Sequence, residues 1–250
     1  MGQRLKFIVA YDGRPFAGWQ SQANGNAVQD HLERAFAAIT RAQLRVHGAG
    51  RTDAGVHALA QCAHVDLPVC TLPAAQWPLA LNAHLPPTIR VLRSACVSEK
   101  FHARYSAIGK TYRYRICDSR VLPPHELGRA WQVASPLDRG VLAGAAKLFV
   151  GRHDFAGFAA NGGKPVEDTV RRISDVRVRP AGRDMIQLEF GGEGFLYRMV
   201  RLMVGAAVRC AIGRWDVEEI RTRLATPAQA QAKARFVAPA EGLFLVRIRY

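Results

Sequence analysis

Hydrophobic and polar residues alternate along several segments of the chain and recur at helical spacing along others. Alternation with a period of two is typical of a half-buried strand, whereas apolar residues three and four positions apart indicate an amphipathic helix. The alternating segments predict strands at residues 5–11, 45–47, 61–67, 89–97, 111–117, 170–178, 185–190 and 243–250. The helical spacing predicts helices at residues 26–39, 72–84, 138–149, 195–212 and 216–224.

The order of these elements predicts the fold class. Each half of the chain combines alternating strands with about two helices, which is typical of an α+β protein. We therefore expect two similar subdomains, residues 1–105 and residues 106–250, which meet near residues 101–110. The first helix is expected to follow an N-cap at Asn26, because Gln29 stands three residues later, as in a capping box.

The charge of the chain indicates a polyanionic partner. Its 250 residues include 35 Lys and Arg against 20 Asp and Glu, a formal net charge of +15. Cations close to phosphates gain free energy by releasing counterions, so this excess favours binding to nucleic acid. Five cysteines without a Cys-x-x-Cys pair argue against a disulfide framework and a zinc ribbon. Because no apolar run reaches membrane-spanning length, we expect a soluble cytoplasmic protein.

The segment from Gly48 to Ala58 is the strongest candidate for chemistry. It reads Gly-Ala-Gly-Arg-Thr-Asp-Ala-Gly-Val-His-Ala, so Asp53 lies among three glycines and two residues after Arg51. Glycine allows a tight turn and the close approach of a ligand. A carboxylate on such a turn, beside a permanent cation, is a candidate nucleophile. The alternative is that Asp53 only caps a turn, and the segment alone does not decide between these interpretations.

Motif spacing argues against a cofactor. The segment lacks the glycine pattern of dinucleotide sites and of P-loops, and the chain has no His-Glu-x-x-His motif. We therefore expect neither a nucleotide cofactor nor a catalytic metal. The histidines His57 and His64 are interpreted as structural residues rather than metal ligands, and the segment 16–20 as a turn with exposed aromatic side chains.

Two further segments hold candidate RNA-contacting residues. Tyr112 and Tyr114 share one face of a predicted strand and are interleaved with arginines, a pattern that suits stacking on a base beside phosphate. Tyr112 is the better stacking candidate, whereas Tyr114 is expected in the sheet core. Arg201 lies at the edge of the apolar stripe of a predicted helix, from which it could extend to water or reach a carboxylate.

Together these motifs resemble the tRNA pseudouridine synthase A family. The resemblance spans nearly the whole chain in the family's order, and its most specific stretch is Gly-Arg-Thr-Asp-Ala-Gly-Val-His-Ala at residues 50–58. The other matching stretches are residues 11–13, 16–20, 101–107, 110–114, 151–155, 194–205 and 240–245.

The resemblance implies a fold and an activity. The fold would be two ferredoxin-like α+β halves that share an extended, mostly antiparallel sheet, with helices on one face and an active cleft between the halves. The activity would be that of an isomerase that converts uridine to pseudouridine in the anticodon stem–loop of tRNA, at positions thirty-eight to forty, without a cofactor. A homodimer is also implied, so that one tRNA touches both subunits.

The resemblance also implies roles for five residues. Asp53 matches the catalytic aspartate, Arg201 the arginine that pairs with it, and Tyr112 the tyrosine stacked on the target base. Leu243 matches an apolar residue of the pocket, and Arg51 the residue that fills the space left by the flipped uridine. Flipping costs a few kcal/mol, so a filler and a stacking partner are physically needed. Whether Asp53 attacks the base, attacks the sugar or removes a sugar proton stays open.

Two other functions compete with this hypothesis. An RNA-binding module or tRNA-folding chaperone would use the same basic charge, although binding alone does not require the set of Asp53, Tyr112 and Arg201. A phosphotransferase with Asp53 as aspartyl nucleophile is the third hypothesis, and the lack of a second acidic metal ligand near Asp53 in the sequence argues against it.

Overall fold

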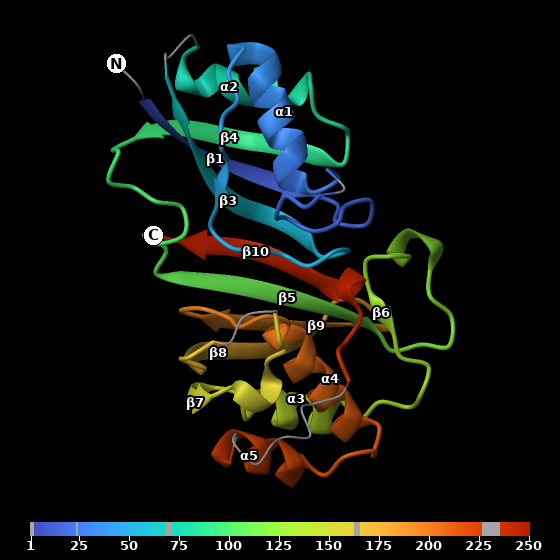
Figure 1. The fold of residues 1–250 in the computed structure, drawn as a ribbon. Coiled ribbons are helices and arrows are strands. Elements are labelled where there is room, and N and C mark those ends of the chain that lie inside the picture. The colour runs from blue at the N-terminus through green and yellow to red at the C-terminus, as the bar shows by residue number, and fades with distance from the viewer. Residues whose placement is uncertain (1–2, 24, 69–71, 163–165, 227–235) are drawn as a thin grey trace. The chain divides into compact units, whose positions relative to one another are not determined.

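The computed structural model describes residues 3–23, 25–68, 72–162, 166–226 and 236–250. Clustering of contacts divides the chain into two units, the first made of residues 1–108 with 244–250 and the second of residues 109–243. Each unit combines a sheet with helices, which confirms the expected α+β class (Figure 1). The sequence pattern placed the closing strand with the second half, and this division groups residues 244–250 with the first unit.

The sheet of the first unit has the strand order β4-β1-β3-β10, and the short β2 pairs with β3. The β1 strand is antiparallel to both neighbours, and β10 runs parallel to β3 with Phe244 opposite His57. Alternation along β1 is complete, since Leu5, Phe7 and Val9 are fully buried. The strands are β1 (Gln3–Tyr11), β2 (His47–Gly48), β3 (His57–Leu67), β4 (Ile89–Val97) and β10 (Leu243–Arg249).

Two helices cover this sheet through aromatic side chains. They are α1 (Val28–Thr40) and the short α2 (Trp77–Asn82), which follows a 3-10 turn at Ala74–Gln76. The ring of Phe36 in α1 lies 5.5 Å from that of Phe7 in β1 and 5.4 Å from that of Trp77. Phe36 therefore contacts both the sheet and α2, and α2 itself packs against β4.

The sheet of the second unit has the order β5-β9-β8-β7, all antiparallel, and β6 pairs with β5 in parallel. Its strands are β5 (Gly109–Cys117), β6 (Trp131–Gln132), β7 (Gly151–Asp154), β8 (Val170–Pro180) and β9 (Met185–Gly192). Its helices are α3 (Arg139–Lys147), α4 (Met199–Ala211) and α5 (Val217–Ala225). Helix α3 packs against α4 and β8, and 3-10 turns occur at Pro124–Glu126, Ala156–Phe158 and Ala240–Gly242.

Two helix starts differ from the sequence expectation. Helix α1 begins at Val28 with Ala27 as N-cap, whose N–H donates to the carboxylate of Asp30 at 2.8 Å. Asn26, the expected cap, instead donates its side-chain amide to the carbonyl of Pro15. Helix α4 begins at residue 199 because Arg198 adopts a left-handed φ of 57°, which ends the turn before it.

Helix α4 is also more deeply buried than an amphipathic helix. Met199, Val200, Met203 and Val204 are at most 3% exposed, and on other sides of the helix Leu202 and Ala206 are at most 2% exposed. A helix that is apolar all round is a core helix. Helix α4 is therefore enclosed by the second unit rather than lying on its surface.

Candidate active site

The loop between β2 and β3 carries Asp53, and its backbone is fixed by Gly18 and Trp19, which lie between β1 and α1. The N–H of Trp19 donates to the carbonyl of Thr52 at 3.0 Å. A Cβ added at Gly18, which has φ of +94°, would lie 2.5 Å from the same carbonyl. The ring of Trp19 lies equally close to Gly48, where an added Cβ would be 2.4 Å from it. Both glycines are therefore required for this close approach of backbone and ring.

Two side-chain hydrogen bonds hold the residues just before Asp53. The phenol of Tyr11 lies 2.8 Å from the hydroxyl of Thr52, buried from water. The amide of Gln61, itself fully buried, donates to the carbonyl of Gly50 at 2.7 Å. The backbone carbonyl of Asp53 closes the turn by accepting the N–H of Val56 at 3.1 Å, and Asp53 is half-buried. The carboxylate thus stands on a backbone that is fixed on both sides.

Arg51 extends outwards from the same loop. Its side chain is exposed, and its Nε donates to the amide oxygen of Gln20 at 3.2 Å. The structure therefore connects Arg51 with the motif at residues 16–20. The aromatic residues of that motif are not exposed as expected from the sequence, since Phe16 is 5% and Trp19 2% exposed. Trp19 is buried against Gly48 and Thr52 of the Asp53 loop, whereas the ring of Phe16 packs edge-on against His31 of α1 at 5.2 Å.

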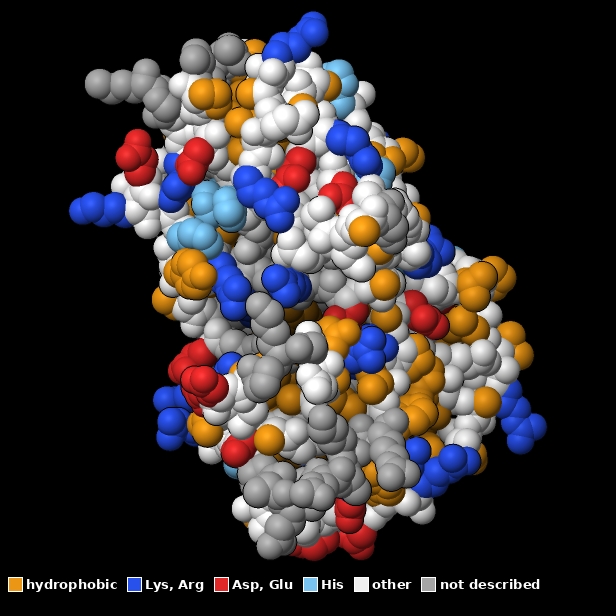
Figure 2. Space-filling view, in the orientation of Figure 1, with side chains coloured by type: hydrophobic (Ala, Val, Ile, Leu, Met, Phe, Trp, Pro, Cys, Tyr) orange, Lys and Arg blue, Asp and Glu red, His pale blue; other side chains and the backbone are white. Residues whose placement is uncertain are grey.

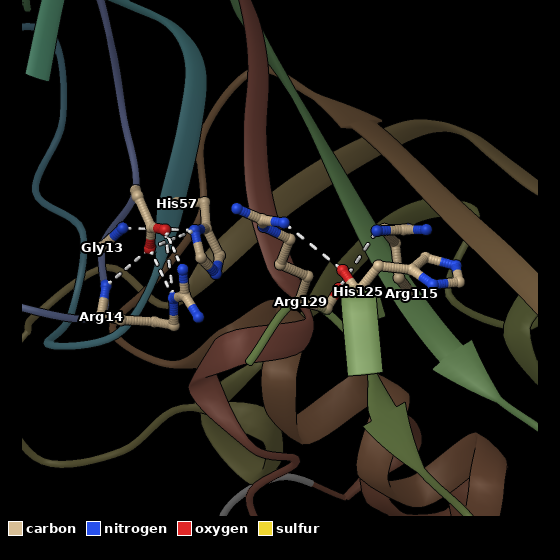
Figure 3. Close-up of polar contacts among 7 residues, drawn as sticks. Gly13, Arg14, His57, Arg115, His125 and Arg129 are labelled. Atoms are coloured by element: carbon tan, nitrogen blue, oxygen red, sulfur yellow. Dashed lines mark hydrogen bonds and ion pairs between the residues drawn. The ribbon is translucent and has the colours of Figure 1, made fainter. Parts of the chain in front are cut away.

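A buried imidazole closes the other end of the loop. His57 is 3% exposed, and its Nδ1 lies 3.3 Å from the carboxylate of Asp12 and accepts the N–H of Gly13 (Figure 3). Its ring stacks on that of Phe244 with centroids 4.5 Å apart. Burial raises the pKa of Asp12, but hydrogen bonds from Arg14 outweigh it, so the net pKa lies below its usual range. Asp12 is therefore an anion paired with Arg14, and the N–H of Gly13 holds the imidazole of His57 beside it.

In the second unit, β5 presents Tyr112 and Tyr114 on its buried face. The ring of Tyr112 lies edge-on to Phe195 at 5.0 Å and is 8% exposed. Tyr114 is fully buried, as expected for a core residue, and its hydroxyl donates to the carbonyl of Pro239 at 2.8 Å. Burial raises the pKa of Tyr114 well above its usual range, so the phenol stays protonated and keeps donating.

Arg201 is tied to the segment that leads to Leu243. Its Nε donates to the carbonyl of Ala238 at 2.7 Å, and the N–H of Ala238 donates back to the carbonyl of Arg201. A Cβ at Gly242 would lie 2.6 Å from the ring of Tyr114. The 3-10 turn before Leu243 is thus held between helix α4 and strand β5, and Leu243 itself is 6% exposed. We call Arg201, Leu243, Tyr114 and Tyr112 on the same strand face the assembly of the second unit, in which the turn before Leu243 connects Arg201 with Tyr114.

The sequence-predicted site residues therefore fall into two groups. Asp53 and Arg51 share a loop of the first unit, and Arg201, Leu243 and Tyr112 belong to the assembly of the second unit. Sequence reasoning did not assign a role to Tyr11, Trp19 or Gln61, which fix the Asp53 loop. Tyr11 and Trp19 lie in the matching stretches 11–13 and 16–20, so the resemblance could have indicated them, whereas Gln61 lies outside these stretches.

Among the described residues, no group of three or more His, Cys, Asp and Glu side chains is arranged to hold a metal ion. Among the same residues, no helix is long and apolar enough to cross a membrane. The four described cysteines, at positions 62, 96, 117 and 210, are all free thiols, and Cys70 lies outside the described residues.

The fold and charge define a mixed α+β protein whose basic surface suits a polyanion. The model of the family described as tRNA pseudouridine synthase matches residues 7–106 and 145–250. A tRNA pseudouridine synthase A of Akkermansia muciniphila is 46% identical over 99% of this chain and 95% of its own length. Those of Rhodospirillum rubrum and Afipia carboxidovorans are 42% and 43% identical over 99% of this chain and cover 87% and 99% of their lengths. The chain belongs to the tRNA pseudouridine synthase family.

Proposed function

We propose that this protein isomerises uridine to pseudouridine in tRNA, at positions thirty-eight to forty of the anticodon stem–loop. The observation that carries the proposal is the family match over both units, which includes the loop of Asp53. Relatives over the full length of the chain are tRNA pseudouridine synthases A. The net charge of +15 provides the general attraction to a phosphate backbone.

The reaction requires no redox partner and no external group. The bond between N1 of uracil and C1′ of ribose breaks, the base rotates, and C5 bonds to C1′. The proton of C5 leaves and N1 acquires one, so the composition of the nucleoside is unchanged. A carboxylate at the junction of sugar and base can serve as nucleophile or as base in this sequence.

Asp53 is our candidate for that carboxylate. The hydrogen bonds of Thr52 and the turn closed by Val56 support this assignment, because they fix the backbone from which the side chain projects. A group held in one orientation loses little entropy in reaching the transition state. The three candidate routes, attack on the base, attack on the sugar and removal of a sugar proton, all use the same ionised side chain.

The other four residues support the flipped nucleotide and the catalytic carboxylate in this proposal. Tyr112 stacks on the target base, Leu243 packs on it, and Arg201 pairs with the carboxylate of Asp53. The ties of Arg201 and of the turn before Leu243 support their roles, because both side chains project from fixed backbone. Arg51 is exposed at the loop and fills the space that the uridine leaves. Stacking by Tyr112, packing by Leu243 and filling by Arg51 each offset part of the free energy of base flipping.

The finer features of the proposal concern assembly and location. We infer a homodimer in which one tRNA contacts both subunits, as the resemblance implies. We also infer a cytoplasmic protein, which fits its free thiols, since disulfides are rare in that compartment. Light scattering of the purified chain tests the first inference and cell fractionation the second.

The direct test of activity uses the purified chain and an unmodified anticodon stem–loop transcript labelled with tritium at C5 of uridine. Because C5 loses its hydrogen when it bonds to C1′, conversion releases tritium to water. We expect release without any added cofactor, and mapping that places pseudouridine at positions thirty-eight to forty. Binding without release would instead indicate an RNA-binding protein or folding chaperone.

A further inference from the structure

The turn that follows strand β4 presents an aromatic surface that the five candidate site residues do not include. Tyr105 is 76% exposed, and its ring lies 4.4 Å from that of His102. The guanidinium of Arg104 lies 5.7 Å from the same ring, and the exposed His47 lies 5.8 Å from His102. We call His47, His102, Arg104 and Tyr105 the Tyr105 surface. All four belong to the first unit.

Hydrogen bonds fix the turn that carries this surface. The N–H groups of Arg104 and Tyr105 donate to Nδ1 of His102 at 3.1 and 3.3 Å. The N–H of His102 donates to the hydroxyl of Ser106, whose own N–H donates back to the carbonyl of His102. Tyr105 is therefore held on a closed turn with its ring in solvent. Because the turn is already ordered, little conformational entropy is lost when a ligand stacks on the ring.

The rings beneath the surface continue the stack into the protein. His64, 1% exposed, lies 5.0 Å from His47 and 4.7 Å from His102. Burial, with help from surrounding cations, lowers the pKa of His64 to about 4, and the same causes lower the pKa of His102. Both rings are thus neutral at pH 7, and they support Tyr105 as aromatic rather than charged groups. Figure 2 shows histidine side chains gathered beside Lys and Arg on the face drawn of this unit.

The charge around the surface favours a nucleic acid over an acidic peptide. Arg4 is already paired with Asp66 through two hydrogen bonds, at 2.6 and 2.8 Å, whereas the guanidinium of Arg104 lies beside the ring of Tyr105, where a ligand would meet it. One arginine beside an exposed aromatic ring offers a base a stacking partner and its phosphate a counter-ion. A run of carboxylates would gain nothing from the three rings.

We propose that the Tyr105 surface is a second RNA-contact site, on which an unpaired base of the substrate RNA stacks outside the active site. The inference rests on the proposed function, because it takes RNA as the ligand. Base–aromatic stacking contributes about 1–3 kcal/mol per base by alanine substitution. Loss of the ring therefore weakens RNA binding without changing the chemical step.

The test compares equilibrium Kd values for an unmodified full-length tRNA transcript, measured by filter binding at fixed salt. Tyr105→Ala raises Kd about tenfold, and Tyr105→Leu does the same because leucine keeps apolar area but has no π face. Tyr105→Phe and Tyr105→Trp bind like the unchanged protein. The control is Leu79→Ala in α2, since Leu79 is 81% exposed in the same unit, and it leaves Kd unchanged.

Three outcomes overturn the inference. If Tyr105→Ala has the same Kd as the Leu79→Ala control, Tyr105 does not contact the RNA. If Tyr105→Leu and Tyr105→Phe have equal Kd values, apolar burial rather than ring stacking accounts for the contact. A change of oligomer mass in Tyr105→Ala with an unchanged Kd makes the surface an interface between copies of the chain. If Tyr105→Ala lowers the Tm, the Kd values of Tyr105→Leu and Tyr105→Phe are compared instead, because both keep a large side chain.

These measurements separate the inference from the proposed function. Absence of tritium release by the unchanged protein overturns the proposed activity and leaves the Kd comparison readable. If release occurs, Tyr105→Ala raises KM for tRNA about tenfold and keeps kcat at saturating RNA. A fall in kcat with unchanged KM would instead place Tyr105 in the chemical step and contradict the assignment.

Discussion

The phenol of Tyr11 and the hydroxyl of Thr52 share a buried hydrogen bond of 2.8 Å. It connects the end of strand β1 with the residue that precedes Asp53, across 41 positions of sequence. The bond is short, both side chains are at most 7% exposed, and neither side chain carries a formal charge. The first strand of the protein therefore supports the loop of the candidate catalytic residue.

Removing this bond tests whether the support matters for catalysis. In Tyr11→Phe the hydroxyl of Thr52 loses a buried partner, which costs about 1 kcal/mol of unfolding free energy. A loop that is less well held misplaces Asp53, so we expect kcat to fall on the order of tenfold with little change in KM. Chemical denaturation and single-site conversion assays measure the two effects. Equal kcat in the variant and the unchanged protein would show that the bond is only structural.

The contact between Gly18 and the carbonyl of Thr52 offers a second test. Gly18→Ala places a Cβ 2.5 Å from that backbone oxygen, so the loop must move. Gly25→Ala is the matched control, because Gly25 also has positive φ but no atom within 4 Å of an added Cβ. Both variants lose about 1 kcal/mol from the left-handed backbone. Only Gly18→Ala should lose conversion as well, and similar activities in the two variants would contradict the role of the contact.

The free energy of unfolding is expected to decrease as the pH is lowered, because His64 titrates at a lower pH in the folded protein. Its pKa is about 4 in the folded protein, against about 6.5 in an unfolded chain. The unfolded state therefore binds the proton first, and stability present above pH 6.5 is lost as the pH falls towards 4. The loss is about 3 kcal/mol at most for one such group.

Urea unfolding at pH 7.5 and pH 4.5 measures this loss. His64→Gln removes the titrating group, so the variant is less stable at pH 7.5 but has a flatter pH dependence. His84→Gln is the control, because His84 is exposed, and it keeps the dependence of the unchanged protein. A His64→Gln profile as steep as that of the control would show that other groups carry the pH dependence.

Tyr114 holds the turn before Leu243 through its hydroxyl. Tyr114→Phe leaves the carbonyl of Pro239 without this donor in a buried place, and we expect a loss of about 1–2 kcal/mol in unfolding free energy. The ring that packs on Gly242 stays, so the fold is kept. Thermal unfolding gives the loss, and the conversion assay shows whether a looser turn raises KM. A Tm equal to that of the unchanged protein would mean that water replaces the bond.

Local pattern was enough to predict most elements of the fold. The strand at residues 89–97 has the predicted bounds, and its first residues alternate, with Ile89 and Val91 buried on either side of Arg90. Helix α3 begins after Asp138, whose carboxylate accepts the N–H of Val141, as expected for a strong N-cap. Signals that lie within a few residues of one another are visible in sequence.

Long-range contacts account for what the sequence did not predict. Phe16 and Trp19 beside a glycine suggested an exposed turn, but Trp19 is buried against the distant Asp53 loop and Phe16 packs on His31 of α1. The left-handed conformation of Arg198 has no sequence signature, since arginine rarely adopts it. For the candidate site, the motif around Asp53 is visible in sequence, whereas the supporting bonds of Tyr11 and Gln61 depend on the pairing of β1 with β3.

The measurement that tests the central assignment most directly is conversion by Asp53→Asn, which removes the ionised carboxylate and keeps its size. We predict a Kd for tRNA within about twofold of the unchanged value and no tritium release from C5-labelled uridine. Asp168→Asn is the control, since that carboxylate is 77% exposed on the second unit, and it should convert normally. Full conversion by Asp53→Asn would contradict the assignment.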